Sequence, residues 1–375
     1  MKGNILVLMI FLFAGVCFPA TITLKSSNLD ECIGITSFLS NSKGEIFLFS
    51  MRTHKVFKFK KNGDFEKSFC RYGVGPGEIK RVLFMFHNPV NDFLYLPEIS
   101  SGVGRVSIFD SNGNFKDYLE VELAPRQKDH IYKLIFLEDG SFYTLLSERV
   151  DWEPKGKIYM AKYKLSVLYF GKNGKLKSPI YTTFQNKEVA DRPRMGGPQV
   201  LFLPSILIKK TPVGNICIGK TDENLLYIYD KCGSKRDSVE LEIKRLLLSD
   251  DEFQKTKSEL VKAFKEGSRM QWLAKHMIKL KYKPIFYNFF VFQDYYVLVD
   301  IKRDGLLEYP EETTLIFFDK KGKRKTSKKI NGNVMNILNT QLYIVEYDQE
   351  GNETFLVKDL DMENQEKVEC FRKED

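Results

Sequence analysis

The chain has few of the residues that build metal and redox centres. Its 375 residues include 6 Cys, 4 His and 2 Trp, and no Cys-x-x-Cys or Cys/His pairing occurs. A zinc site is therefore not expected, because structural zinc takes four Cys or His ligands at short spacings. The histidines are widely dispersed, as is typical of surface or core residues; they are His54, His87, His130 and His276. The sequence identifies no cofactor.

The cysteines do not form a disulfide framework. Cys17 lies in the apolar leader, and the other five are irregularly spaced at Cys32, Cys70, Cys217, Cys232 and Cys370. Five residues allow at most two bridges, and their pairing stays open. A chain of this length buries a core large enough to do without them.

Long apolar runs are missing after the first 20 residues. Residues 1–20 combine Lys2 with an apolar run from Ile5 to Phe13, followed by small residues. This pattern predicts a secretory signal peptide, since the run is too short to span a bilayer. Cleavage near the end of this segment and lipidation at Cys17 are both compatible with the sequence. We expect an exported protein, either periplasmic or tethered to the outer membrane through Cys17.

The charge balance is moderately basic, with 58 Lys and Arg against 49 Asp and Glu. The densest basic run, Lys320 to Lys329, straddles a glycine between two strand-like segments. Such a run is expected to form a solvated hairpin tip. Elsewhere in the chain, acidic residues are interspersed among the basic ones. We therefore expect no nucleic-acid partner and no contact with a membrane beyond the lipid tether.

Aromatic residues and a repeat indicate a β protein. The 30 Phe and 18 Tyr favour pleated strands. An apolar strand, a short polar segment, a turn glycine and a second strand recur five times. The turn glycines are Gly63, Gly113, Gly174, Gly233 and Gly322.

Each repeat follows another strand-like run. These runs are Ile46 to Phe49, Phe93 to Leu96, Tyr159 to Tyr163, Asn215 to Ile218 and Tyr295 to Val299. A sixth pair, Gln341 to Tyr347 and Thr354 to Leu360, keeps the pattern without the clean turn. The sequence thus predicts an all-β fold, a six-bladed propeller over residues 22–372. We expect a strand near Ile33 to Leu39 to complete the last blade.

A helical insertion interrupts the repeats between blades 4 and 5, over residues 249–280. Ser249 and Glu252 have the spacing of a capping box, and apolar residues then recur at helical intervals until Gly267. A second helical period follows from Met270 to Leu280. We expect two short helices that cover a propeller face and contribute to binding more than to folding.

One loop carries a family resemblance. Residues Gly73 to Glu78 read Gly-Val-Gly-Pro-Gly-Glu. In this segment the chain resembles the exported six-bladed β-propellers of Gram-negative bacteria, which are related to NHL-repeat and TolB-like propellers. Lys61-Asn62-Gly63 departs from the Asp-x-x-Gly turn of that family. The resemblance implies the fold, covers most of the mature chain and implies no agreed catalytic residues.

The same loop has a simple interpretation from its residues. Gly73, Gly75 and Gly77 permit unusual backbone angles, Pro76 stiffens the loop, and Glu78 can accept free amides. Its glycine spacing matches neither the dinucleotide fingerprint nor a P-loop. We therefore predict a structural loop.

Catalytic candidates are weak. The chain lacks a Gly-x-Ser-x-Gly elbow. Four carboxylates beside predicted strands are candidates for a central channel: Asp92, Glu98, Asp294 and Asp300. The polar segment Arg192 to Pro198 is interpreted as a crossover between blades, with a ligand-facing loop as the alternative.

These observations favour a monomeric, non-enzymatic binding or scaffold propeller. Its partner would be a protein, peptide or glycan of the cell envelope, and its identity is open. The alternative is a propeller lyase or hydrolase with a metal held in the channel. Convergence of His and Asp or Glu side chains at the channel would favour that alternative.

Overall fold

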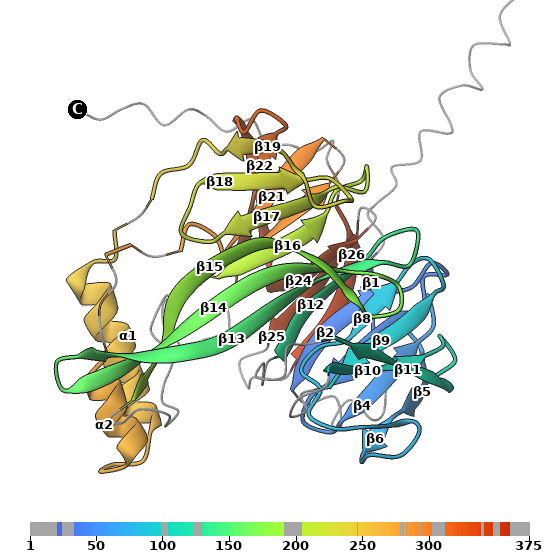
Figure 1. Cartoon of the computed structure of the whole chain (residues 1–375), viewed down its shortest axis with the longest axis horizontal. Coiled ribbons are helices and arrows are strands. Elements are labelled where there is room, and N and C mark those ends of the chain that lie inside the picture. The colour runs from blue at the N-terminus through green and yellow to red at the C-terminus, as the bar shows by residue number, and fades with distance from the viewer. Residues whose placement is uncertain are drawn as a thin grey trace, which may run out of the picture.

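Four-stranded antiparallel sheets form most of the chain in the computed structural model (Figure 1). The structure describes residues 21–24, 34–98, 104–122, 130–190, 205–245, 247–277, 279, 281–282, 284–292, 294–301, 312–338, 341–347 and 353–360. Within these residues there are six such sheets, here numbered in chain order, and one parallel pair of short strands. This confirms the prediction of an all-β fold.

The first three sheets follow one another along the chain. Sheet 1 contains β2 (Ile35–Ser40), β3 (Ile46–Ser50), β4 (Lys55–Phe59) and β5 (Phe65–Phe69). Sheet 2 contains β8 (Phe86–Asn88), β9 (Phe93–Pro97), β10 (Gly104–Phe109) and β11 (Phe115–Val121). Sheet 3 contains β12 (His130–Phe136), β13 (Phe142–Lys155), β14 (Ile158–Phe170) and β15 (Leu176–Ala190).

The remaining sheets keep this order except at the end. Sheet 4 contains β16 (Ile206–Lys210), β17 (Ile216–Lys220), β18 (Leu225–Tyr229) and β19 (Lys235–Glu240). Sheet 5 contains β20 (Asn288–Phe292), β21 (Tyr295–Ile301), β22 (Glu312–Asp319) and β23 (Arg324–Asn331). Sheet 6 contains β24 (Asn333–Leu338), β25 (Gln341–Tyr347), β26 (Glu353–Asp359) and, from the other end of the chain, β1 (Thr21–Thr23). The parallel pair is β6 (Arg71–Tyr72) and β7 (Glu78–Ile79).

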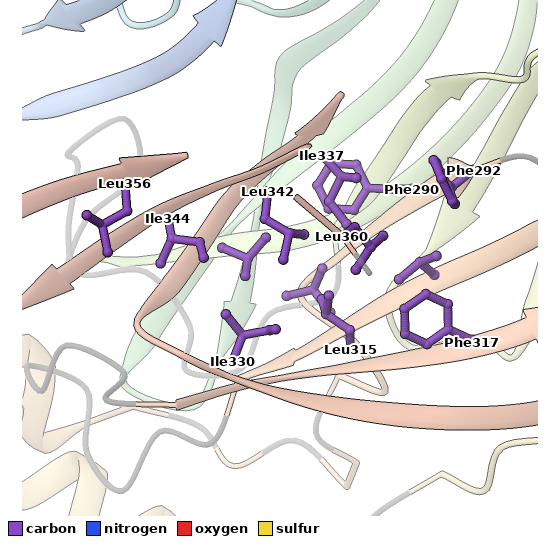
Figure 2. Packing of buried hydrophobic residues seen from close by; sticks show 13 residues of the cluster. Phe290, Phe292, Leu315, Phe317, Ile330, Ile337, Leu342, Ile344, Leu356 and Leu360 are labelled. Atoms are coloured by element: carbon purple, nitrogen blue, oxygen red, sulfur yellow. The ribbon is translucent and has the colours of Figure 1, made fainter. Parts of the chain in front are cut away.

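The core is divided among the spaces between consecutive sheets. Six clusters of buried apolar residues each combine side chains from two neighbouring sheets. Figure 2 shows the cluster between sheets 5 and 6, where Leu315 and Phe317 lie opposite Leu342 and Ile344. Another cluster joins sheet 6 to sheet 1, so the last sheet packs against the first. The fold is therefore propeller-like.

The strands are apolar on both sides because each sheet is covered on both faces. In β3, Ile46 and Leu48 lie in the cluster toward sheet 6, whereas Phe47 and Phe49 lie in the cluster toward sheet 2. Side chains alternate between the two faces of a strand, so two-sided burial requires an unbroken apolar run.

The strand that joins the two ends of the chain differs from the prediction. β1 pairs with β26, with Thr23 opposite Leu356. The segment expected in that place, Ile33 to Leu39, instead contributes β2, which pairs with β3 inside sheet 1. The expectation was wrong because β2 carries the buried Phe38 and Leu39, which suit a strand packed between sheets.

The third repeat also differs from the prediction. Tyr159 to Tyr163 is not a separate strand but part of β14, which runs unbroken from Ile158 to Phe170. The true partner before it is β13, which pairs with β14 out to the Lys155 and Ile158 positions. No glycine or proline occurs within β14 to interrupt the ladder. The long strands are green in Figure 1.

The turn glycines tie each sheet to the sheet before it. All five have positive φ, at Gly63, Gly113, Gly174, Gly233 and Gly322. At Gly174, φ is 77° and the carbonyl accepts the Glu122 N–H at 2.9 Å. A Cβ at Gly174 would lie 1.9 Å from the Glu120 carbonyl oxygen of β11. Glycine is therefore required both by the turn and by the adjacent sheet.

The insertion between β19 and β20 forms two helices, α1 (Asp250–Ala263) and α2 (Arg269–Lys275). The predicted capping box is present, since the Ser249 Oγ accepts the Glu252 N–H and the Glu252 carboxylate accepts the Ser249 N–H, both at 3.1 Å. Phe253, Leu248 and Met277 form a small cluster of their own. In the described part of the chain, neither helix has the length and apolarity needed to cross a bilayer.

Candidate functional site

The first strands of neighbouring sheets lie side by side and are called the inner strands here. β12 contacts β8 and β16, β16 contacts β20, and β2 contacts both β8 and β24. Side chains from different sheets therefore meet along these strands. The inner strands are mainly apolar, and their lysines are Lys133 in β12 and Lys209 and Lys210 at the end of β16. Lys133 and Lys209 have ammonium groups that lie over aromatic rings of neighbouring inner strands.

Lys133 lies in β12 next to an irregularity of the ladder. The register between β12 and β13 shifts between Ile131 and Lys133, so Tyr132 has no opposite residue in β13. Such a bulge bends the strand and redirects the side chains beside it. The Lys133 ammonium lies 5.4 Å from the centroid of the Phe86 ring in β8.

Lys209 lies in β16 and extends toward the next sheet. Ile206 and Ile208 of the same strand are buried between sheets 3 and 4. The alternation of the strand therefore places Lys209 on the opposite face, where its ammonium lies 4.0 Å from the centroid of the Phe290 ring in β20. Both lysines thus rest on aromatic rings of neighbouring inner strands, a favourable arrangement for a cation.

The surroundings of the two ammonium groups disfavour their charge. Burial lowers the pKa of Lys133 to about 8. Burial, followed by repulsion from Lys133, lowers the pKa of Lys209 well below its ordinary value. Each side chain nevertheless keeps a partly exposed surface. The ammonium groups are therefore enclosed by protein, although the two residues are not fully removed from solvent.

Neither lysine has a carboxylate partner among the described residues. Lys58, by contrast, is fully buried and pairs with Glu45 at 2.7 Å and Glu66 at 3.2 Å. Two cations that repel each other and lack a counter-charge attract an anion, which removes the repulsion and supplies the missing hydrogen-bond acceptors. The arrangement is suited to a carboxylate, phosphate or sulfate group.

The loop predicted from glycine spacing lies elsewhere, beside the outer strand β5. The Glu78 carboxylate accepts the Val74 and Gly75 N–H groups at 3.0 and 2.9 Å and pairs with Arg71 at 2.8 Å. These bonds, led by the Gly75 amide, lower the pKa of Glu78. The Tyr118 hydroxyl of β11 donates to the Gly75 carbonyl. The loop is therefore hydrogen-bonded to β11, the outer strand of sheet 2.

The glycines of this loop have different roles. Gly77 has a φ of 79°, the left-handed region expected of a turn glycine. A Cβ at Gly73 would lie 2.0 Å from the Glu78 carboxylate, and one at Gly75 would lie 3.2 Å from it. Pro76 is exposed. The structural role of the loop stays a prediction.

The other sequence candidates do not converge. His87 pairs with Asp92 at 2.8 Å, and burial lowers the pKa of His87. Glu98 is buried and binds the Arg105 guanidinium through both of its oxygens. Asp294 pairs with Lys320 in an exposed contact. Among the described residues, no three His, Cys, Asp or Glu side chains are grouped to hold a metal ion.

Some predicted features lie outside the described residues. These are residues 1–20 with Cys17, the segment Arg192 to Pro198, Cys32 and Cys370. The described cysteines are Cys70, Cys217 and Cys232, and all three are free thiols. Burial raises the pKa of Cys70 and of Cys217 well above the ordinary value.

The lysine pair was missed in the sequence because its members are 76 positions apart in unrelated segments. The available signal was local: Lys133 lies between Ile131-Tyr132 and Leu134 to Phe136, and Lys209 follows Ile206 to Ile208. A lysine beside an apolar run indicates a buried charge, but only the contact between β12 and β16 shows that two such lysines are neighbours.

Comparison with known proteins finds solved structures of similar fold. No family model matches the chain, and no curated protein matches it in sequence. A predicted exported protein from Bacteroides fragilis has a TM-score of 0.50 at 12% identity, over 92% of this chain and 95% of that one. A DUF4221 family member from Bacteroides vulgatus has a TM-score of 0.49 at 12% identity, covering 91% and 95% of the two chains.

A third structure is an inactive virginiamycin B lyase from Staphylococcus aureus with quinupristin. Its TM-score is 0.41 at 9% identity, over 92% of this chain and 90% of that one. At 12% identity, the similarity to the Bacteroides fragilis structure shows a common fold and leaves the chemistry undetermined, because one fold hosts many functions.

Proposed function

We propose that the protein is an exported six-bladed β-propeller that binds, without catalysis, a ligand bearing an anionic group at Lys133 and Lys209. The observation that carries the proposal is the pair of enclosed ammonium groups that has no carboxylate partner among the described residues. The six four-stranded sheets, with clusters between each consecutive pair, support six blades. The Gly73 to Glu78 loop supports a relation to NHL-repeat and TolB-like propellers.

An acidic group on a peptide or glycan of the cell envelope would satisfy this site. Such a group would lie between two cations and above two aromatic rings, where water is partly displaced and charge-assisted hydrogen bonds are strong. The metal-dependent lyase or hydrolase alternative needs a ligand cluster, and the described residues contain none. Nothing in that part of the chain favours it over binding.

Anion binding is testable with inorganic phosphate and citrate as probes. We expect both to be bound at pH 7, and the Lys209→Met and Lys133→Met variants each to weaken binding by roughly 10–100-fold, the value of a charge-assisted hydrogen bond. Affinity should also fall as the pH rises through about 8, where Lys133 loses its proton. Calorimetric titration measures both effects.

The matched control is Lys323→Met, on the exposed turn between β22 and β23. It removes the same charge without touching the inner strands, so its affinities should equal those of the wild type. Unchanged binding by the Lys133→Met/Lys209→Met double variant would refute the site.

Export to the periplasm or the outer membrane is the second part of the proposal, and it depends on residues 1–20 and Cys17. We expect the wild type to leave the cytoplasm and, if Cys17 is the lipidation site, to incorporate labelled fatty acid and sediment with membranes. The Cys17→Ser variant should then be released as a soluble protein. An unlabelled, soluble wild type would exclude the tether, and cytoplasmic retention would exclude export.

A further inference from the structure

The helical insertion has a large excess of basic over acidic residues. Residues 244–283, here called the helical module, contain 11 Lys or Arg and 5 Asp or Glu, in a chain whose net charge is +9. Three of the five acids, Asp250, Asp251 and Glu252, occupy the first turn of α1, where they stabilise the helix N-terminus. The remainder of the module is therefore strongly basic.

Several basic side chains of the module are exposed among the described residues. Lys255 and Lys262 of α1 are seven positions apart and share a face, opposite the buried Phe253 and Thr256. Lys275 of α2 is also exposed. In Figure 1 the two helices stand at one end of the molecule. A cationic surface is thus presented on an appended element.

An aromatic side chain accompanies this charge. Trp272 of α2 is 36% exposed, whereas the next two residues, Leu273 and Ala274, are fully buried. The Trp272 ring stacks on His276 at a centroid distance of 4.0 Å. An exposed indole beside lysines is suited to the headgroup layer of a membrane, because indole combines an apolar body with a polar N–H and lysine side chains are attracted to anionic lipid.

We propose that the helical module docks the protein onto a membrane surface rich in anionic phospholipid. The module binds in the plane of the interface, with Trp272 among the headgroups and the lysines against the phosphates. This contact is independent of the Lys133 and Lys209 site and of lipidation at Cys17, and it replaces the sequence-based expectation of no membrane contact beyond a lipid tether. Charge complementarity and the exposed indole together select a lipid surface over a soluble anion.

The other basic region of the chain lacks these features. Lysines of the run from Lys320 to Lys329 form ion pairs with acidic residues outside it. Lys325 pairs with Asp319 at 3.0 Å, and Lys329 pairs with Glu312 at 3.1 Å. The run contains no tryptophan. It therefore serves as an internal control in which the same number of lysines can be reversed.

The first test is co-sedimentation with vesicles of phosphatidylcholine, alone or with about one-third phosphatidylglycerol. The protein is used in a Cys17→Ser background, which removes any lipid tether. The variant K255E/K262E/K275E should bind anionic vesicles at least about 100-fold more weakly, since each lysine near the surface contributes about fivefold. The control K320E/K321E/K323E should bind like the parent.

The second test uses the two tryptophans of the chain. Trp152→Phe leaves Trp272 as the only indole, and its fluorescence emission should shift to the blue when anionic vesicles are added. Equal weakening in both charge-reversal variants would overturn the proposal in favour of unspecific attraction. Binding to soluble polyphosphate and to vesicles alike, with unshifted Trp272 emission, would overturn it in favour of a soluble polyanion.

Discussion

Gly174→Ala is expected to lower the free energy of unfolding by about 3–5 kcal/mol, the range of severe single substitutions. An alanine there must adopt a φ of 77°, which costs about 1–2 kcal/mol for an L-residue. Its Cβ would also lie 1.9 Å from the Glu120 carbonyl oxygen, so sheet 3 must move away from sheet 2. Chemical denaturation monitored by circular dichroism measures the loss.

The chain contains a control that separates the two causes. Gly214 has a φ of 84° and no atom within 4 Å of the added Cβ position. Gly214→Ala should therefore cost only the backbone term of about 1–2 kcal/mol. If the two variants lose equal stability, the contact between sheets at Gly174 contributes nothing and our account of it fails.

Lys133→Met is expected to have the opposite effect and to raise the free energy of unfolding by roughly 3 kcal/mol at pH 7. The pKa of Lys133 is about 8 in the folded protein, against 10.5 for a solvated lysine, and each pKa unit corresponds to about 1.4 kcal/mol. Below pH 8 both states carry the charge, so the folded state bears the full desolvation cost. Methionine removes that cost and retains the apolar stem.

The pH dependence distinguishes this cause from simple repacking. Between about pH 8 and 10.5 the unfolded chain keeps the proton of Lys133 and the folded chain has lost it, so the wild type gains stability as the pH rises. The advantage of Lys133→Met should therefore shrink across that window. A pH-independent advantage, measured by denaturation at several pH values, would contradict the explanation.

Lys58→Met is the matched control for a buried lysine with partners. Hydrogen bonds and ion pairs with Glu45 and Glu66 outweigh burial and raise the pKa of Lys58. Its replacement leaves two carboxylates without their cation and should destabilise the protein by about 1–3 kcal/mol. The two lysine-to-methionine substitutions are thus expected to change the free energy of unfolding in opposite directions. A lysine that costs stability is expected where the charge has a use in binding.

The sequence by itself determined the local features of this protein. The five turn glycines each sit at a positive φ, because a short hairpin requires it and few other residues tolerate it. The capping box of Ser249 and Glu252 formed as its spacing predicts. These features depend on residues within a few positions of one another, so they can be predicted directly from the sequence.

Only the tertiary structure decided which distant segments are neighbours. The pairing of β1 with β26 joins residues more than 330 positions apart, and local patterns favoured the more apolar β2 for that place. Lys133 and Lys209 are brought together because β12 and β16 begin neighbouring sheets. In the sequence, each lysine is only a polar residue beside an apolar run. Burial and the repulsion between charges depend on this arrangement in space, which is why the candidate site emerged only from the fold.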